Sequence, residues 1–369
     1  MRTCVRGFDR ALAIIQDGGK RSVIHSARQG NATFLKDMES KPRCPTSQIE
    51  VKCSTANRQS SRSSLEREGR HLNLKATEAP HHSADTERPI ADVTLGELAR
   101  FPEVDRRERL SVDEFKHEYL DRNRPVVITD AIESWPARRA WTMDFFRSRY
   151  GHLTPRVYHY DPNDQFTPGD VTQIRLDEYI DNATTRDWKD YPYYMRDDWR
   201  ILHDSPELKK DYTKLPYFFD WFELLPQFMR MPYPRLFIGP KGATTPVHID
   251  VWRTHAWLSQ LVGRKRWIFF PPDQEPLLYD CKVRVDRPDL AKHPKYREAR
   301  PVEATIGPGD TIFAPSGWAH WVISLDATLS LTGNYMGPGC FGTCVPGIFK
   351  TFVVDRVRSR LGLAVAQNS

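Results

Sequence analysis

Long apolar runs are absent from this sequence, and their absence excludes the simplest membrane classes. No window of 18 or more consecutive apolar residues occurs, so we expect no membrane-spanning helix. The N-terminus also lacks the compact apolar stretch and small-residue cleavage site of a secretory signal. An organelle transit peptide is disfavoured, because the basic residues within positions 1–30 do not share one face of an amphipathic helix.

Cysteine is scarce and shows no pairing pattern. The six cysteines fit neither a disulfide framework nor the spacing of a cysteine-based zinc site. Cys340 and Cys344, in "GCFGTC", offer two thiols to a metal, but we interpret them as loop cysteines in a reducing compartment. We therefore expect the protein in the cytosol or the nucleus.

Aromatic residues are almost missing from the first quarter of the chain. Residues 1–88 contain no Trp, no Tyr and only two Phe, whereas all 10 Trp and all 14 Tyr come later. Such a segment cannot bury enough apolar surface to offset its chain entropy. It also carries the whole formal net charge of +6, which leaves the remainder neutral. We therefore expect a disordered basic extension over residues 1–90, and a folded part without the positive field that favours nucleic acid.

From residue 91 the sequence has the signals of a mainly β domain with flanking helices. Helices are expected at residues 110–120, where Ser111 and Glu114 form a capping box, at 142–151 and at 175–183. β-Branched residues predict a short strand at 124–132. From residue 234 an apolar period of two predicts strands at 234–239, 255–262, 265–270, 302–306, 311–315, 320–325 and 328–336. No helical pattern separates these later strands, so we expect an antiparallel sandwich or barrel over residues 91–340. Residues 341–369 then form a C-terminal helix or tail.

The motif "TTPVHID" places a histidine and an aspartate inside this apolar sheet sequence. On a strand, alternate residues point to one face, so His248 and Asp250 are expected to project together. His320, in "PSGWAHWVISL", begins another predicted strand. Two histidines and one carboxylate are the ligands of the non-haem Fe(II) oxygenases, which keep coordination positions open for a cosubstrate and O₂. A His-x-Asp pair alone is more often an ordinary polar pair at a strand end.

A lysine on the next predicted strand strengthens the metal hypothesis. In "GRKRWIFF", Lys265 shares the face of Trp267 and Phe269 if these aromatic residues point inward. A lysine inside a sheet is costly unless it meets an anion. 2-Oxoglutarate, the usual cosubstrate of such oxygenases, carries a second carboxylate that fits this requirement. The alternative is a surface lysine whose ammonium reaches water.

Two segments carry a family resemblance. The runs "TTPVHIDVWRTHAWLSQLVGRKRWIFFPP" and "GPGDTIFAPSGWAHWVISLDATLSLTGNY" resemble the JmjC family of the cupin superfamily, and "RPVVITDAIESWPA" resembles its N-terminal segment. The similarity covers residues 92–340 and is greatest to the small single-domain protein hydroxylases of the lysyl-hydroxylase-like branch. It implies a double-stranded β-helix, the jelly-roll barrel of the cupins, and dependence on Fe(II), 2-oxoglutarate and O₂.

The resemblance also implies roles for individual residues. The metal ligands, which are also the catalytic residues, are His248, Asp250 and His320. The positions that contact 2-oxoglutarate are Lys265, Thr245, Thr332, Tyr194 and Asn334, and Tyr193 is an alternative to Tyr194. One position departs from the family pattern, because Leu258 stands where some members have an asparagine that helps to bind the cosubstrate.

We therefore expect a dioxygenase that hydroxylates a side chain of a protein substrate while 2-oxoglutarate loses CO₂ to give succinate. A lysine or arginine demethylase of histones or other proteins, a hydroxylase of a small molecule or a tRNA base, and a non-enzymatic cupin scaffold are the alternatives. No membrane and no nucleic acid partner of the folded domain is expected. The C-terminal segment has apolar residues at helical spacing, which are Phe349, Phe352, Val353, Val357 and Leu361. Because this segment is short, we expect a monomer or weak homodimer.

Overall fold

The computed structural model describes residues 101–161 and 168–360. The extension expected over residues 1–90 and the last residues, 361–369, lie outside the described part. No helix within the described residues is long and apolar enough to cross a membrane.

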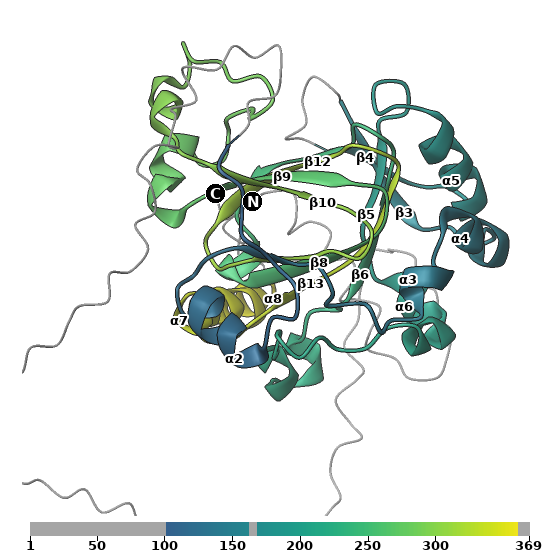
Figure 1. Cartoon of the computed structure of the whole chain (residues 1–369), viewed down its shortest axis with the longest axis horizontal. Helices are drawn as coiled ribbons and strands as arrows, with labels where there is room; N and C mark the ends of the chain where they lie inside the picture. The colour runs from purple at the N-terminus through teal and green to yellow at the C-terminus, as the bar shows by residue number, and fades with distance from the viewer. Residues whose placement is uncertain (1–100, 162–167, 361–369) are drawn as a thin grey trace, which may run out of the picture. The chain divides into compact units, whose positions relative to one another are not determined.

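Two β-sheets form the core of the described domain (Figure 1). The larger has nine strands in the order β1-β2-β11-β8-β13-β6-β5-β3-β4, and the smaller has four in the order β10-β9-β12-β7. Paired strands are antiparallel, except that β1 is parallel to β2. The strands are β1 (Arg106–Arg107), β2 (Val126–Ile128), β3 (Arg156–Tyr160), β4 (Pro168–Gln173), β5 (Tyr193–Asp198), β6 (Arg235–Gly239), β7 (Thr244–His248), β8 (His255–Val262), β9 (Lys265–Phe270), β10 (Val302–Ile306), β11 (Thr311–Ala314), β12 (Ala319–Ser324) and β13 (Thr328–Tyr335).

The two sheets face each other across one apolar layer. Trp267 and Phe269 of β9 pack in the same cluster as Leu258 of β8 and Ile312 of β11. All six residues of β9 are buried, which explains why this strand reads as an almost continuous apolar run. Burying a side chain as large as that of Phe269 stabilises the fold by about 2–3 kcal/mol. The mainly β fold with flanking helices that the sequence predicts is confirmed, and the expected strands are found within a few residues of their predicted ends.

Helices cover the outer face of the larger sheet. Phe146 of α4 and Tyr179 of α5 pack with Met195 and Leu236 of the sheet, and Figure 1 shows α4 and α5 beside β3, β4 and β5. Thr142 caps α4 as predicted, since its hydroxyl accepts a hydrogen bond from the Phe145 N–H. The helical elements before β6 are α2 (Val112–Phe115), η2 (Lys116–Leu120), α3 (Ala137–Ala140), α4 (Met143–Tyr150), α5 (Leu176–Thr185), α6 (Arg200–Asp204), η3 (Pro206–Lys210), η4 (Trp221–Leu224) and η5 (Gln227–Met229).

The segment between β9 and β10 covers the outer face of the smaller sheet. It contains the short helices η7 (Pro272–Leu278) and η8 (Pro294–Glu298). Leu278 and Tyr296 from this segment pack against Phe270 of β9 and Trp321 of β12. Both faces of this sheet are therefore buried, one by the opposite sheet and the other by this segment.

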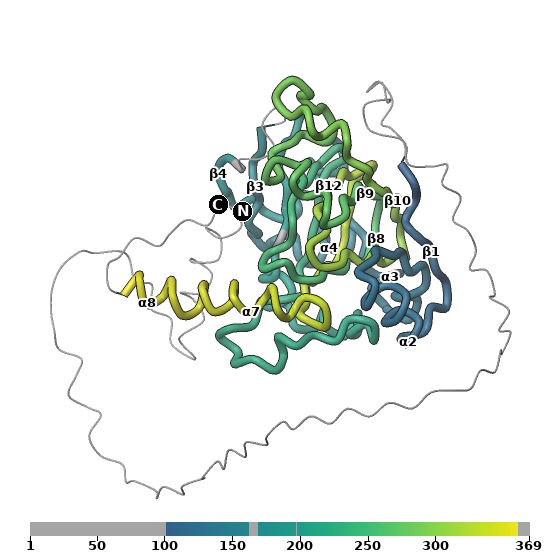
Figure 2. Tube along the Cα trace, turned by 90° about the vertical axis from the view of Figure 1, so that its left-hand side faces the viewer, coloured from purple at the N-terminus to yellow at the C-terminus, as the bar shows by residue number. Residues whose placement is uncertain are grey.

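The chain continues beyond β13 into α7 (Phe341–Phe349), η9 (Lys350–Val354) and α8 (Asp355–Arg360), which Figure 2 shows following one another as one rod. Phe352 is buried, whereas Phe349, Val353 and Val357 are exposed, and Leu361 lies outside the described residues. The expected helix is therefore present, but only part of its predicted apolar face packs on the rest of the domain.

Candidate active site

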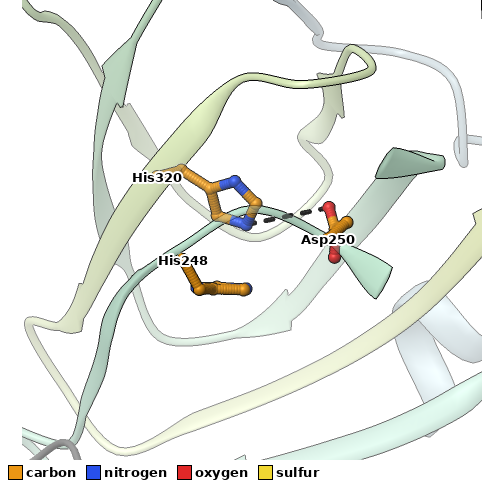
Figure 3. A group of neighbouring side chains, drawn as sticks. All are labelled: His248, Asp250 and His320. Atoms are coloured by element: carbon orange, nitrogen blue, oxygen red, sulfur yellow. Dashed lines mark ion pairs between the residues drawn. The ribbon is translucent and has the colours of Figure 1, made fainter. Parts of the chain in front are cut away.

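The three predicted metal ligands meet where β7 and β12 lie side by side. His248 is the last residue of β7, and it is the direct partner of His320 across the antiparallel pair. The rings of the two histidines lie 4.3 Å apart, centroid to centroid. The Asp250 Oδ2 atom is 3.9 Å from the His320 Nε2 atom. A dashed line joins these two side chains in Figure 3. One ligand atom from each residue lies within 4.8 Å of the other two, so the sequence prediction of a common site is consistent with this geometry.

Asp250 reaches the site by a different route from the one expected. The expectation that His248 and Asp250 share one strand is wrong, because β7 ends at His248 and Asp250 precedes the 3₁₀ turn η6 (Val251–Arg253). Pro246, which has no N–H group, is tolerated in β7 because this strand is the edge of its sheet. The carboxylate is therefore placed by the bend after the strand, and not by strand alternation.

The backbone fixes how both histidines present their nitrogens. His248 Nδ1 lies 2.8 Å from the Pro246 carbonyl oxygen, and His320 Nδ1 lies 3.1 Å from the Trp318 carbonyl oxygen. A carbonyl oxygen only accepts, so each Nδ1 carries the proton and each Nε2 keeps its lone pair for a metal. Desolvation, followed by the nearby His320, lowers the pKa of His248 to about 4, so this imidazole is neutral at pH 7.

Aromatic rings of β9 hold the His320 imidazole in place. The Trp267 ring stacks on His320 at 5.3 Å between centroids, and the Phe269 ring lies at 5.7 Å. Both residues are buried in the layer between the sheets. This packing leaves His320 only 4% exposed and restricts its rotation. A preoriented imidazole loses little freedom when it binds a metal.

Lys265 lies deeper between the sheets, on the same face of β9 as Trp267. Its side chain is 1% exposed, and its Nζ donates to the Tyr194 hydroxyl at 3.2 Å. The aromatic rings of Tyr194 and Phe237 flank the ammonium at 5.8 and 5.5 Å. Within residues 101–161 and 168–360, no carboxylate lies within 4 Å of this ammonium. A small carboxylate therefore fits here, because a buried cation without an anion is costly.

Two of the remaining predicted contact residues, Thr332 and Asn334, have hydrogen-bond partners within the domain. The hydroxyl of Thr332 donates to the Trp257 carbonyl at 2.6 Å, so its oxygen keeps lone pairs but has no proton to offer. The Asn334 amide donates to the Thr254 hydroxyl at 3.0 Å, in the loop that follows Asp250. Thr245 lies on β7 opposite Val322, three residues before His248. Their proposed contact with a cosubstrate remains a prediction.

The structure distinguishes the predicted Tyr194 from its alternative Tyr193, and it adds Arg196, a neighbour that was not predicted from the sequence. Tyr194 contacts Lys265, whereas Tyr193 instead packs against His159. Arg196 follows two residues after Tyr194 on β5, and its guanidinium lies between the rings of Tyr158 and Tyr160, 5.4 Å from each centroid. Its charge contributes to the lowered pKa of His248. The signal was available in the "YHY" and "YYMRDD" segments, but neither β3 nor β5 was predicted as a strand.

Cys340 and Cys344 do not join this site. Both are buried in a cluster with Phe222 and Met336, and Cys340 accepts a hydrogen bond from the Gly337 N–H. Among the described residues, His248, Asp250 and His320 are the one group of His, Cys, Asp and Glu side chains arranged to hold a metal.

Comparison with known proteins places this geometry in a family. Residues 112–337 match the family described as the cupin-like domain. The chain is 36% identical to the lysine-specific demethylase JMJ21 of Arabidopsis thaliana over 254 residues, and these residues cover 65% of this chain and 26% of that protein. It is 32% identical to the human 2-oxoglutarate and iron-dependent oxygenase JMJD4 over 256 residues, which cover 61% of this chain and 59% of that one.

A further relative is the bifunctional arginine demethylase and lysyl-hydroxylase psr-1 of Caenorhabditis elegans. It is 30% identical over 243 residues, which cover 61% of this chain and 59% of that protein. The chain thus spans between about a quarter and three fifths of the length of these relatives. The family match covers more than half of the chain, includes every strand except β1, and contains His248, Asp250 and His320. The chain therefore belongs to the cupin-like family and carries a JmjC-type domain.

Proposed function

We propose that this protein is an Fe(II)- and 2-oxoglutarate-dependent oxygenase that hydroxylates a side chain of a protein substrate. The observation that carries the proposal is the pairing of two sites between the same sheets. One is the group of two imidazoles and one carboxylate, and the other is the buried Lys265 ammonium. Imidazole and carboxylate suit Fe(II), and the ammonium suits a dicarboxylate cosubstrate.

The chain's own residues have separate tasks in this proposal. His248, Asp250 and His320 would hold the metal, with each Nδ1 proton engaged by a backbone carbonyl. Lys265 and Tyr194 would bind the distal carboxylate of 2-oxoglutarate and orient its other end. When bound, Fe(II) with 2-oxoglutarate and O₂ supplies the oxidation that inserts one oxygen atom into a C–H bond and releases succinate and CO₂. The apolar layer around Trp267 and Phe269 excludes water from this reaction.

A protein is the proposed substrate class. The partly exposed Arg196 and Tyr158, of which Arg196 contributes to the lowered pKa of His248, fit a polar peptide better than an apolar small molecule. We keep the cytosol or the nucleus as the proposed location, on the cysteine pattern of the sequence.

Demethylation of a lysine or arginine is a second candidate function. The matched relatives JMJ21 and psr-1 carry demethylase names, and the name of psr-1 includes lysyl hydroxylase as well. The same chemistry at an N-methyl carbon produces an unstable hydroxymethyl group that leaves as formaldehyde. The product mass therefore separates the two functions.

The test uses the purified full-length protein with Fe(II), 2-oxoglutarate and a cell extract. We expect succinate release together with a gain of about 16 mass units on a protein residue, because one oxygen atom is added. A loss of about 14 mass units would favour demethylation. The Asp250→Ala protein is the control, and we expect it to fold but to form no succinate. Succinate production by Asp250→Ala at the wild-type rate would contradict the proposed metal centre.

A further inference from the structure

The backbone immediately after Asp250 is strained. Trp252 and Arg253 have φ angles of 53° and 56°, in the left-handed region that residues with a Cβ rarely adopt. Each such residue costs about 1 kcal/mol or more, and it persists only where the surrounding structure holds it. Arg253 also donates its backbone N–H to the Asp250 carbonyl at 2.9 Å. The conformation of Trp252 and Arg253 therefore determines the direction of the chain immediately after Asp250.

Arg253 is held from two sides. Its guanidinium binds Glu275 in η7, with nitrogen–oxygen distances of 2.7 and 2.6 Å. Its carbonyl accepts a hydrogen bond from the Ser316 hydroxyl at 2.6 Å, just before the strand that carries His320. These contacts fix one half of the left-handed pair, but they do not touch the Trp252 side chain.

Trp252 is held by the C-terminal helix. Its indole packs against Phe352 of η9 and Phe222 of η4, with centroid distances of 5.8 and 6.0 Å. The closest approach is at Gly347 of α7. A Cβ added to Gly347 would lie 2.4 Å from the Trp252 Cδ1 atom, 3.0 Å from Cγ and 3.3 Å from Cβ. These atoms are at the base of the side chain, so the indole cannot swing away without moving its own backbone.

We propose that Gly347 and Trp252 are positioning residues for the metal centre, through which α7 holds Asp250 in place. The absence of a side chain at Gly347 lets α7 approach until it clamps Trp252 in the left-handed conformation. That conformation turns the chain after Asp250 so that its carboxylate faces His248 and His320. This inference rests on the proposed function, because it assumes that the three residues bind a metal.

A glycine pair in the same helix gives a matched test. Gly342, like Gly347, lies in α7, but nothing lies within 4 Å of a Cβ added to it. Alanine favours a helix over glycine by about 1 kcal/mol, so both Gly→Ala substitutions support the helix itself. Only Gly347→Ala pushes on Trp252. Titration of the metal-free full-length protein with Mn²⁺, followed by electron paramagnetic resonance, measures the affinity of the centre without requiring turnover.

We expect Gly347→Ala to bind Mn²⁺ about 10-fold more weakly, the lower end of the usual effect of disturbing a residue that supports a ligand. Gly342→Ala should bind like the wild type. The melting temperatures of the metal-free proteins are compared in parallel, and a purely structural role would lower that of Gly347→Ala while leaving its Mn²⁺ affinity intact. In turnover, the concentration of Fe(II) needed for half activation should rise, whereas the KM for 2-oxoglutarate should stay unchanged.

Trp252→Gly keeps the inference testable if Gly347→Ala does not fold. Glycine adopts the left-handed conformation freely, so this variant removes the indole without adding strain. We expect it to weaken Mn²⁺ binding by about 10-fold, and adding Gly347→Ala to it should cause no further loss, since the clash is gone. Wild-type affinity in either single variant overturns this inference alone. Absence of Mn²⁺ binding by the wild type overturns the metal centre, and this inference with it.

Discussion

Lys265 is a buried cation that a bound carboxylate would neutralise. The side chain is 1% exposed, and its ammonium donates to the Tyr194 hydroxyl and lies over the rings of Tyr194 and Phe237. A buried ammonium in such surroundings is retained when a ligand brings the opposite charge. The role of Lys265 is therefore best tested through the cosubstrate and not through stability.

Replacing Lys265 by alanine should raise the KM for 2-oxoglutarate by about two to four decades, because the distal carboxylate then loses roughly 3–5 kcal/mol of interaction. Fe(II) binding should change little. Lys265→Arg should keep part of the affinity, since the charge stays but the guanidinium has a different shape. Succinate formation is measured against 2-oxoglutarate concentration, with the exposed Lys282→Ala as control. Equal KM values in Lys265→Ala and wild type would assign the cosubstrate to another cation.

Asp220 is a second residue whose environment has a measurable consequence. Desolvation raises its pKa to about 6, although its Oδ1 accepts hydrogen bonds from the Phe222 and Met336 N–H groups. The folded state therefore binds this proton more tightly than the unfolded chain does. The associated stability is present below about pH 4 and is lost as the pH rises through about 6.

We expect Asp220→Asn to be more stable than the wild type at pH 8 by about 1 kcal/mol, a value reduced for partial solvent exposure. Asparagine keeps the oxygen acceptor but removes the buried charge. At pH 4 the difference should vanish, because wild-type Asp220 is then protonated in the fold. Urea denaturation at both pH values measures the free energies of unfolding. A difference independent of pH would mean that charge is not the cause.

At the scale of elements, the helix starts show how local sequence determines local structure. Ser111 accepts a hydrogen bond from the Glu114 N–H, and the Glu114 carboxylate accepts from the Ser111 N–H, as the sequence predicts. These reciprocal bonds satisfy groups that have no partner at a helix start.

Ser111→Ala should lower the free energy of unfolding by about 1 kcal/mol, because the capping bond is lost. Ser148→Ala is the matched control, since Ser148 lies inside α4 and its hydroxyl bonds to the Asp144 carbonyl of its own helix. Alanine at that position should be neutral or slightly stabilising. Urea denaturation compares the two variants, and equal losses would show that the cap contributes no more than any surface serine.

At the scale of the whole molecule, the sequence predicts that the first 88 residues are not needed for the core. A protein that starts at residue 89 keeps all the residues of both sheets and of the metal site. We expect its melting temperature and Mn²⁺ affinity to equal those of the full chain within error. Limited proteolysis of the full chain should produce a similar stable fragment. A shortened protein that does not fold would show that this segment contributes to the core.

Self-association is a second question at this scale. Phe349, Val353 and Val357 remain exposed on the C-terminal rod by 56%, 39% and 51%. Exposed apolar side chains favour contact between copies, but those at single positions are common on monomers. We keep the prediction of a monomer or weak dimer, which light scattering at micromolar concentrations measures. A tight dimer in that range would contradict it.

The sequence by itself determined the type of most elements and the residues of the candidate site. The apolar residues of β8, β9 and β13 predict these strands, because most residues of each strand are buried in the fold. His248, Asp250 and Lys265 were singled out as polar residues within apolar strand sequence, and the resemblance to the JmjC family implied the roles of these three residues and of His320. Their common location in the structure agrees with that reading.

Only the tertiary structure decided how those residues are supported. Strand alternation was the wrong reason for placing Asp250, because a left-handed bend held by a helix about a hundred residues later turns it toward the histidines. Arg196 reaches the site through strands that have no clear alternating pattern. Phe349 and Phe352 were predicted to share one apolar helix face, yet Phe349 is exposed and Phe352 is buried. Such outcomes depend on contacts between distant segments, which determine burial and strain and leave no periodic signal in the chain.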